Sequence, residues 1–408
     1  MNILNKYTYN YFLFLFSIIP LTLVAGSAVS FINILVIDLS FIILLIIKKN
    51  FYFLKNKTII YFFILYIYLI FNSFISIDFS ESISRNLGFL RIIILFVAFN
   101  YFYYQKLFFE KMFKSWLLIL LIVVFDLFVE FFYGKNILGY DVTGYGNPKR
   151  IVSFFKDEPV VGSFVSAFFL ILTGFFLNQK KKYRPYVLLA MVLFFISILA
   201  TTERTATIKS LIGMSIFFLL YKELNLKTKI LSFLFIFLII FTFAINSYDI
   251  KHRYTTQLRT VHKTVYFDLY QSGFAVFKNY KLFGVGNKNY RVETCSKEIS
   301  ENKGFYKNKD YRCSTHPHQI YFELLSEHGL IGTIIFLLIF YKLIFSKIMK
   351  TILEKNYLKI GALTYLINGF LPVIPSGAFF SSFSLTLFAI NLSIFYASDE
   401  DMNIFKIK

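Results

Sequence analysis

Long, uninterrupted apolar runs are the feature that most limits how this chain can fold. Residues 11–27 and 59–77 contain no charged side chain, and their lengths match the roughly 17–25 residues that a helix needs to cross a bilayer. Lipid offers no hydrogen bonds to an open backbone, and the runs lack the polar–apolar alternation of barrel strands. The sequence therefore predicts an all-α integral membrane protein.

The order of these runs predicts about twelve transmembrane helices. The second run follows the first almost at once, so we expect the first to be a span and not a removable signal peptide. No linker or internal repeat divides the chain, and residues 1–408 are predicted to form a single polytopic membrane domain. The predicted helices cover residues 11–28, 31–47, 58–77, 87–103, 115–133, 160–178, 185–201, 206–221, 228–245, 318–345, 358–372 and 376–397.

The formal net charge of +20 follows from the loops between these runs. Lys and Arg gather in alternate short loops, for example at residues 48–57, 106–114, 180–184 and 222–229. That asymmetry marks the cytoplasmic side of a membrane protein. We therefore expect both termini to be cytoplasmic, the location to be a bacterial inner membrane, and membrane lipid rather than nucleic acid to be the partner of this charge.

One long polar segment, residues 246–317, separates the ninth and tenth predicted helices and is expected to be a large periplasmic loop. Its many basic residues fit either an ordinary solvated surface or a partner such as an anionic headgroup, a pyrophosphate or an acidic glycan. Both cysteines of the chain, Cys295 and Cys313, lie in it. An oxidising compartment favours a disulfide between them, because zinc sites use closer cysteine pairs.

Charged residues inside the apolar runs need a partner or a function. Arg91 is predicted to pair with Asp126 and Glu130, which are four residues apart on the next helix. Arg204 lies in a tight outer turn, where it either reaches the headgroups or binds a phosphate. The carboxylates at 157–158 lack the spacing of a metal site, and no metal is predicted.

Residues 315–332 contain three of the five histidines of the chain. The segment resembles the His-Asn-x-Tyr-Leu…Glu-x-Gly-x-x-Gly signature of the O-antigen ligase and O-antigen polymerase superfamily. Gln319 replaces the usual Asn and Phe322 the usual Leu. The matching positions are His318, Tyr321, Glu327, Gly329 and Gly332.

Two further elements carry the same resemblance. Residues 201–206 resemble the Ser-x-Arg element of this superfamily, with Arg204 as the matching arginine. Residues 283–290 resemble its Gly-x-Gly-x-x-x-Phe element. The resemblance extends from about residue 146 onward, and the first four predicted helices contribute only hydropathy.

The resemblance implies a membrane glycosyltransferase of lipopolysaccharide biosynthesis that needs neither a metal nor a cofactor. It would move a glycan from undecaprenyl pyrophosphate to an acceptor hydroxyl at the periplasmic face. The resemblance makes His318 the general base and Arg204 the cation that stabilises the pyrophosphate leaving group. Further pyrophosphate-binding candidates are Arg150, Arg259, Lys288 and Arg291, and supporting roles fall to His316, Tyr321 and Glu327.

Three functions remain open. A ligase would use the lipid A core as acceptor, and we favour it because the histidine motif is closer to that branch. A polymerase would use a second lipid-linked repeat unit. A lipid or glycan transporter is a more distant alternative. Transporters of this size usually contain two similar halves and helices broken near the midplane, whereas this sequence shows no internal repeat and mostly unbroken apolar runs.

Overall fold

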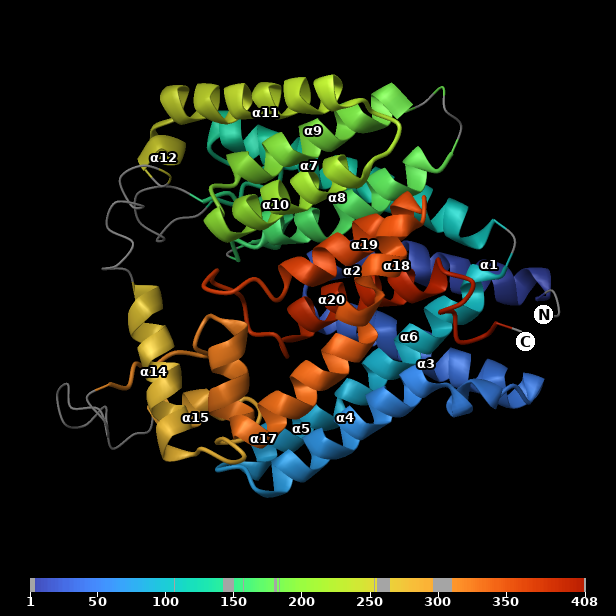
Figure 1. Cartoon of the computed structure of the whole chain (residues 1–408), viewed down its shortest axis with the longest axis vertical. Helices are drawn as coiled ribbons and strands as arrows, with labels where there is room; N and C mark the ends of the chain where they lie inside the picture. Colours follow the sequence, from blue (N-terminus) through green and yellow to red (C-terminus); the bar gives the residue numbers. More distant parts are fainter. Residues whose placement is uncertain are drawn as a thin grey trace.

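A computed structural model describes residues 4–406, except residues 106, 142–149, 157, 180–181, 183, 253, 255–264 and 296–309. Within this part of the chain all regular structure is helical (Figure 1). The first half contains α1 (Lys6–Ser17), α2 (Ile19–Ala25), α3 (Ser27–Lys48), α4 (Lys57–Phe74), α5 (Phe79–Leu87), α6 (Phe89–Tyr103), α7 (Phe108–Tyr133), α8 (Val161–Leu177) and α9 (Arg184–Ala200). The second half contains α10 (Arg204–Leu220), α11 (Leu226–Asn246), α12 (Tyr248–Lys251), α14 (Val265–Asn279), α15 (Tyr290–Thr294), α17 (Ile320–Leu343), α18 (Ile348–Leu353), α19 (Tyr357–Asn368) and α20 (Ser382–Ala397).

Each of the twelve predicted ranges contains a helix, but fewer helices are long enough to cross a membrane. Five described helices pass that test by length and composition, or six if the bent pair α1 and α2 counts as one span. Some predicted ranges were longer than the helices because apolar loop residues extend them. The last predicted range, for example, starts at residue 376, whereas α20 begins at Ser382. Others, such as 31–47 and 115–133, were shorter than α3 and α7.

The first predicted helix is broken into α1 and α2, whose axes differ by 42°. Pro20 sits in the first turn of α2, where its missing N–H costs nothing. The carbonyl oxygen of Leu15, close to the break, accepts a hydrogen bond of 3.3 Å from the Asn33 side chain of α3. A polar side chain from the neighbouring helix therefore satisfies backbone near the bend, as lipid cannot.

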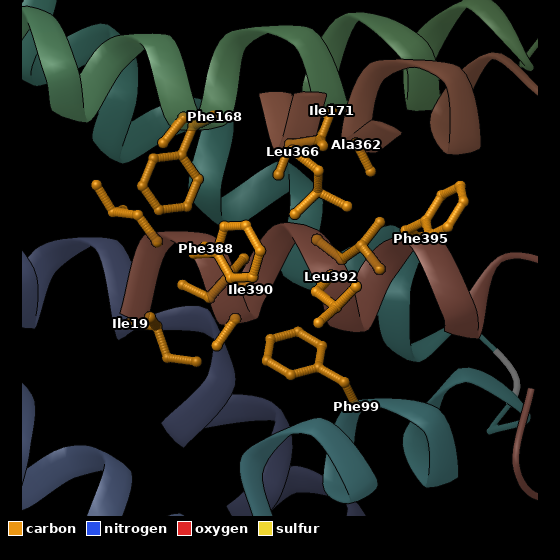
Figure 2. Close-up of a cluster of buried hydrophobic side chains, with 14 of the residues drawn as sticks. Ile19, Phe99, Phe168, Ile171, Ala362, Leu366, Phe388, Ile390, Leu392 and Phe395 are labelled. Atoms are coloured by element: carbon orange, nitrogen blue, oxygen red, sulfur yellow. The ribbon is translucent and has the colours of Figure 1, made fainter. Parts of the chain in front are cut away.

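The core surrounds α20, in which every residue from 385 to 397 is buried. Figure 2 shows Phe388, Ile390 and Leu392 of α20 among side chains of the helices on either side. A helix that is apolar all round belongs in the centre of a bundle, which explains why α20 shows no amphipathic pattern. The neighbours labelled there are Ile19 of α2, Phe99 of α6, Phe168 and Ile171 of α8, and Ala362 and Leu366 of α19.

The two ends of the chain lie on the same side of the bundle, and α14 and α15 lie at the opposite end (Figure 1). The C-terminal residues are tied down beside the N-terminal half. Phe405 packs on Phe53 and Tyr101, with ring centroids 5.3 Å apart in each pair. The buried Lys359 ammonium pairs with Asp399 and with Glu354, the latter at 2.6 Å.

Two glycines allow α8 and α19 to approach closely. A side chain on Gly361 would overlap the backbone of Leu170, and one on Gly174 would overlap the backbone of Tyr357. Small residues commonly serve this purpose where helices pack in membranes. The contact helps to fix α19, and the loop after it, against the rest of the bundle.

We predict that Gly361→Ala lowers the stability of the purified protein by about 1–3 kcal/mol, because the added methyl group must displace backbone. Thermal unfolding in detergent measures this loss. Gly377→Ala is the control, since its methyl group would meet only the mobile Ser384 hydroxyl oxygen, at 3.3 Å. Equal melting temperatures for the two variants would contradict the proposed close contact.

Candidate active site

The helix α17 is broken at Gly329, whose φ of 63° and ψ of −166° lie outside the helical region. The break would leave carbonyl and amide groups of the helix without partners. The loop after α14 supplies them, because the amides of Val285 and Gly286 donate to the carbonyls of Ser326 and Glu327, both at 2.9 Å. In the other direction, the amides of residues 330 and 331 donate to the carbonyls of residues 281 and 282 at 2.8 and 3.0 Å.

The glycines of the two sequence motifs make this docking possible. A side chain on Gly329 would overlap the backbone of residues 282 and 283, and one on Gly284 would overlap that of Glu327. Gly332 leaves room for the Tyr68 hydroxyl group, which donates to the carbonyl of His328 at 3.1 Å. The Gly-x-Gly and Gly-x-x-Gly elements are therefore two halves of one packing unit.

Asparagine side chains attach α4 and α5 to the same loop. The Asn287 amide N–H donates to Asn72 Oδ1 at 2.9 Å, and the Asn287 side chain donates to Asn86 Oδ1 at 2.5 Å. Asn289 Oδ1 accepts from the amide N–H of Asp78 at 2.7 Å. These bonds set α5 beside α15 and α17 through both of its ends, although more than 200 residues of sequence separate them.

A polar cavity of about 790 Å³ lies where these elements meet. Its walls come from α5, from the loop 287–288 with α15, from residues 315–316, from α17 and from the loop 378–381. The charged and titratable side chains that line it are Asp78, Glu81, Arg85, Lys288, Arg291, His316, Glu323 and Glu327. The structure thus brings together Lys288, Arg291, His316 and Glu327 of the sequence-predicted residues.

Most charges in this cavity are already compensated. Lys288 forms an ion pair with Glu81. The Arg85 guanidinium donates to the carbonyl oxygen of Phe380 and lies close enough to Glu327 to interact with its charge. Arg291, by contrast, is exposed and forms no ion pair within the described part of the chain. It is therefore the cation in this cavity most available to an anionic ligand.

Glu323 and Glu327 lie four residues apart on α17, and both are 2% exposed. Glu323 accepts hydrogen bonds from the amide N–H of Phe379 at 2.9 and 3.1 Å. Glu327 accepts from the amide N–H of Tyr290 at 3.3 Å. Each carboxylate therefore fixes a neighbouring loop as well as lining the cavity. This fits the supporting role predicted for Glu327, and Glu323 is a counterpart that the sequence did not reveal.

His316 and His318 stand next to each other, with ring centroids 3.9 Å apart. His316 is buried on the cavity wall, and both of its ring nitrogens are engaged: Nε2 lies 3.2 Å from the Ser376 carbonyl oxygen and Nδ1 lies 2.9 Å from Thr315 Oγ1. Because a carbonyl oxygen only accepts, Nε2 carries the proton and Nδ1 accepts from Thr315. His318 is more exposed, and its ring contacts that of Tyr266 at 5.8 Å.

Burial disfavours the charged form of both imidazoles. It lowers the pKa of His316 to about 4, with a further contribution from the adjacent His318, while the Ser376 carbonyl acts in the opposite direction. Burial likewise lowers the pKa of His318 below its ordinary value of 6.5. Both rings are therefore neutral at pH 7, the form in which imidazole accepts a proton.

Arg204 and Arg150 lie in a different part of the site. Arg204 opens α10, directly after Glu203. Glu203 is buried and caps α8, accepting from the amides of Gly162 and Ser163 at 2.6 and 3.2 Å. Burial raises the pKa of Glu203 to about 7, whereas these bonds and the nearby Arg150 favour its carboxylate. Neither arginine lines the cavity of about 790 Å³.

The remaining predicted residues do not join the cavity. Tyr321 points toward the end of α19, where its hydroxyl group donates to the Phe370 carbonyl at 2.8 Å. Arg259 lies outside the described residues. The predicted pairing of Arg91 with Asp126 and Glu130 was wrong. The two acids instead hold the segment after α7, through bonds to Ile137, Val152 and Ser153, and Arg91 donates to Ser382 at 3.0 Å.

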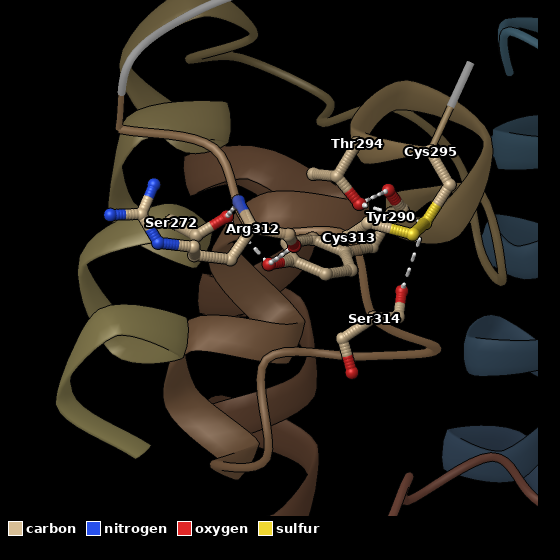
Figure 3. Close-up of a disulfide and its surroundings, with 7 residues drawn as sticks. All are labelled: Ser272, Tyr290, Thr294, Cys295, Arg312, Cys313 and Ser314. Carbon is tan, nitrogen blue, oxygen red and sulfur yellow. Dashed lines mark hydrogen bonds between the residues drawn. A yellow bond between two sulfur atoms is a disulfide. The ribbon is translucent and has the colours of Figure 1, made fainter. Parts of the chain in front are cut away.

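Cys295 and Cys313 form a disulfide beside the cavity, with Cα atoms 4.7 Å apart (Figure 3). The bond joins the end of α15 to the segment that leads to His316. Next to it, the Tyr290 hydroxyl group lies 2.6 Å from Ser272 Oγ and donates to the Arg312 carbonyl at 3.2 Å. The disulfide and this network together hold residues 310–316 against α14 and α15.

Within the described ranges, no group of three or more His, Cys, Asp and Glu side chains is arranged to hold a metal ion. The sequence missed four of the charged cavity residues, Asp78, Glu81, Arg85 and Glu323. Glu323 had a usable signal, since it lies four residues before Glu327 and thus on the same helix face. Arg85 had none, because only the folded chain brings α5 to α17.

The fold and this site define a helical membrane protein with a polar, charge-lined cavity between α5, α15 and α17. Figure 1 shows α15 at the end of the bundle opposite to the chain termini. Residues 189–337 match the sequence profile of the family described as O-antigen ligase, which confirms the predicted resemblance to that superfamily. The match includes α10, α14, α15 and most of α17. No curated protein matches the chain significantly. The family consists of glycosyl-transferring enzymes that act on lipid-linked glycans.

We predict that Cys295→Ser lowers the stability of the purified protein by about 3 kcal/mol, because the disulfide closes a loop of 18 residues. Denaturant unfolding with and without reductant measures the loss. The reduced wild-type protein is expected to match the variant, and reductant should leave the variant unchanged. A further loss on reducing Cys295→Ser would contradict this assignment, since the chain has no other cysteine pair.

Proposed function

We propose that this protein is a membrane glycosyltransferase of the O-antigen ligase type. It transfers a glycan from undecaprenyl pyrophosphate to a hydroxyl group of a lipid A-core acceptor. The observation that carries the proposal is that Thr315 and His316, inside the family match, line a cavity that also contains Arg85, Lys288 and Arg291. His318 does not line this cavity, but its ring lies 3.9 Å from that of His316. Transfer from a pyrophosphate needs both a base for the acceptor and positive charge for the leaving group.

His318 is our candidate for the general base. The two ring nitrogens of His316 are engaged by Ser376 and Thr315, so His316 is better suited to orient the segment than to take a proton. His318 adopts a left-handed backbone conformation with φ of 58°, an arrangement that costs roughly 1–2 kcal/mol. Its carbonyl oxygen accepts from the Ser376 amide N–H at 2.8 Å, which holds that conformation.

Arg204 is our first candidate for stabilising the leaving pyrophosphate, and Arg150, which interacts with the charge of the preceding residue Glu203, is a second. A guanidinium fixed at the start of a helix binds phosphate well, because its donors are rigid and the helix N-terminus adds positive potential. Arg291 and Lys288, which line the large cavity, are further candidates for binding the anionic part of the substrate. Tyr321, Glu323 and Glu327 keep the histidine segment and the adjoining loops in position.

The proposed location is a bacterial inner membrane, with cytoplasmic termini and a periplasmic site. Two features support this orientation. In the sequence, the loops rich in Lys and Arg alternate with loops poor in them, and the predicted order of spans puts the basic loops on the same side of the membrane as the termini. In the structure, α14 and α15 lie at the end of the bundle away from the termini (Figure 1). The disulfide also fits a periplasmic site, because that compartment is oxidising.

Deleting the gene and running the extracted lipopolysaccharide on a gel tests the reaction. A ligase predicts a core without polymer, with the polymer left on undecaprenyl pyrophosphate. A core that carries a single repeat unit would instead assign the polymerase reaction. An unchanged ladder would overturn the proposal and favour transport or a different glycan.

We predict that His318→Ala and Arg204→Ala each reduce transfer by at least about 100-fold, since each removes a group that acts in the transition state. The assay is glycan transfer in vesicles, at equal amounts of inserted protein. His252→Ala is the matched control, because His252 lies near the end of α12 and outside the cavity. Full activity of both site variants would remove their assigned roles.

The lowered pKa of His318 predicts how the rate constant of glycan transfer falls as the pH becomes acidic. A depressed pKa keeps the imidazole neutral as the pH falls below 6.5, so the base is lost only at more acidic pH. We therefore expect the rate constant of transfer to stay above half its maximum at pH 6.5. A midpoint clearly above 6.5 would show that His318 is not the group that titrates.

A further inference from the structure

A second cavity, of about 130 Å³, lies between α8, α10, the start of α17, α19 and α20. Residues 205, 206, 209 and 210 line it from one face of α10, directly after Arg204. Its only charged lining residue within the described part of the chain is Lys209. This cavity shares no lining residue with the large cavity, and it meets the cap formed by Glu203 at Ser163.

Lys209 has no anionic partner here. No carboxylate lines the cavity, and Lys209 forms no ion pair among the described residues. An ammonium group in such a site loses much of its hydration without gaining an opposite charge, which is costly. An anionic ligand would compensate for that cost.

Several polar groups at this cavity also lack partners. Ser210 Oγ and Asn368 Oδ1 are buried without a hydrogen bond, in residues that are 1% and 4% exposed. Ser376 Oγ is likewise buried and unpaired. Buried polar groups in proteins are normally hydrogen-bonded, so the two unpaired hydroxyl groups of Ser210 and Ser376 at a cavity with a single lysine indicate a missing ligand, whereas Asn368 Oδ1, an acceptor, would need a donor. Hydroxyl donors beside an ammonium group suit the oxygens of a phosphate.

The rest of the lining is apolar and aromatic, and includes Phe169, Phe383 and Leu387. A fully hydrated free anion would gain nothing from such a surface, whereas a phosphate ester of a lipid would bury apolar chain there. The cavity also adjoins the proposed chemistry, because Lys209 follows Arg204 by about 7.5 Å along the helix axis. Ser376 lines it as well, and the same residue contacts His316 and His318 through its backbone.

We propose that this cavity binds the phosphate of a polyprenyl carrier, with Lys209 as the cation and Ser210 and Ser376 as hydroxyl donors. The proposal deepens the proposed function, on which it rests for the identity of the lipid. The carrier phosphate then lies on the membrane side of Arg204. The glycan extends from there toward the histidine segment.

The test measures binding of undecaprenyl monophosphate to the purified full-length protein in detergent. Lys209→Met is expected to weaken binding by at least about tenfold, since a charge-assisted contact is lost. Lys209→Arg should retain affinity. Lys227→Met is the control and should bind like wild type, because Lys227 is an exposed residue in the first turn of α11. Unchanged binding to Lys209→Met would overturn the proposal. If Lys209→Met does not fold, Ser210→Ala and Ser376→Ala carry the same test, with a smaller expected loss of about threefold.

Two further probes identify the source of the phosphate. Phosphatidylglycerol that binds equally well, with the same dependence on Lys209, would overturn the polyprenyl assignment in favour of a membrane headgroup. Inorganic phosphate that binds equally well would overturn the role given to the apolar lining. The gel test of the gene deletion is independent of these measurements. An unchanged ladder with Lys209-dependent lipid binding would reject the proposed reaction and keep the phosphate site.

Discussion

The break in α17 at Gly329 is the constraint on which the rest of the site depends. Unpaired backbone groups at membrane depth cost several kcal/mol each, so the break exists only because residues 281–286 supply the missing partners. That docking fixes the loop that carries Lys288 and leads into α15. It also separates the first turns of α17, with Glu323 and Glu327, from the apolar remainder of the helix. One interruption in one helix thus sets the geometry of a whole cavity.

The charges of that cavity follow from the same arrangement. Acids and cations from α5, α15 and α17 face one another and largely cancel, as in the pair of Lys288 with Glu81. Such pairs at a partly solvated site contribute little to stability. Their value here lies in fixing positions, which leaves Arg291 as the cation able to meet an anionic ligand. A preorganised site of this kind needs little rearrangement when charge develops during reaction.

Hydropathy predicted the helices, and local motifs predicted part of the site. Neither could predict which helix faces meet or which distant segments come into contact. All twelve apolar ranges contain helices because apolar runs and helices coincide in membranes. The pairing of Arg91 failed because a helix that is apolar all round gives no sign of which face meets its neighbour. Arg91 in fact lies next to Asp38 and Ser382, on helices far from α7 in sequence. Arg85 was missed for the same reason, since its neighbours become visible only in the folded chain.

Ser376 explains how two separate cavities can serve one reaction. Its amide and carbonyl groups bind the backbone of His318 and the ring of His316, while its hydroxyl group remains unpaired at the smaller cavity. A phosphate bound there would therefore contact the residue that positions both imidazoles. The large cavity reaches the same segment through Thr315 and His316. A donor held by its phosphate in the smaller cavity would thus present its sugar close to the residues that orient both imidazoles, where an acceptor hydroxyl group can reach the proposed base.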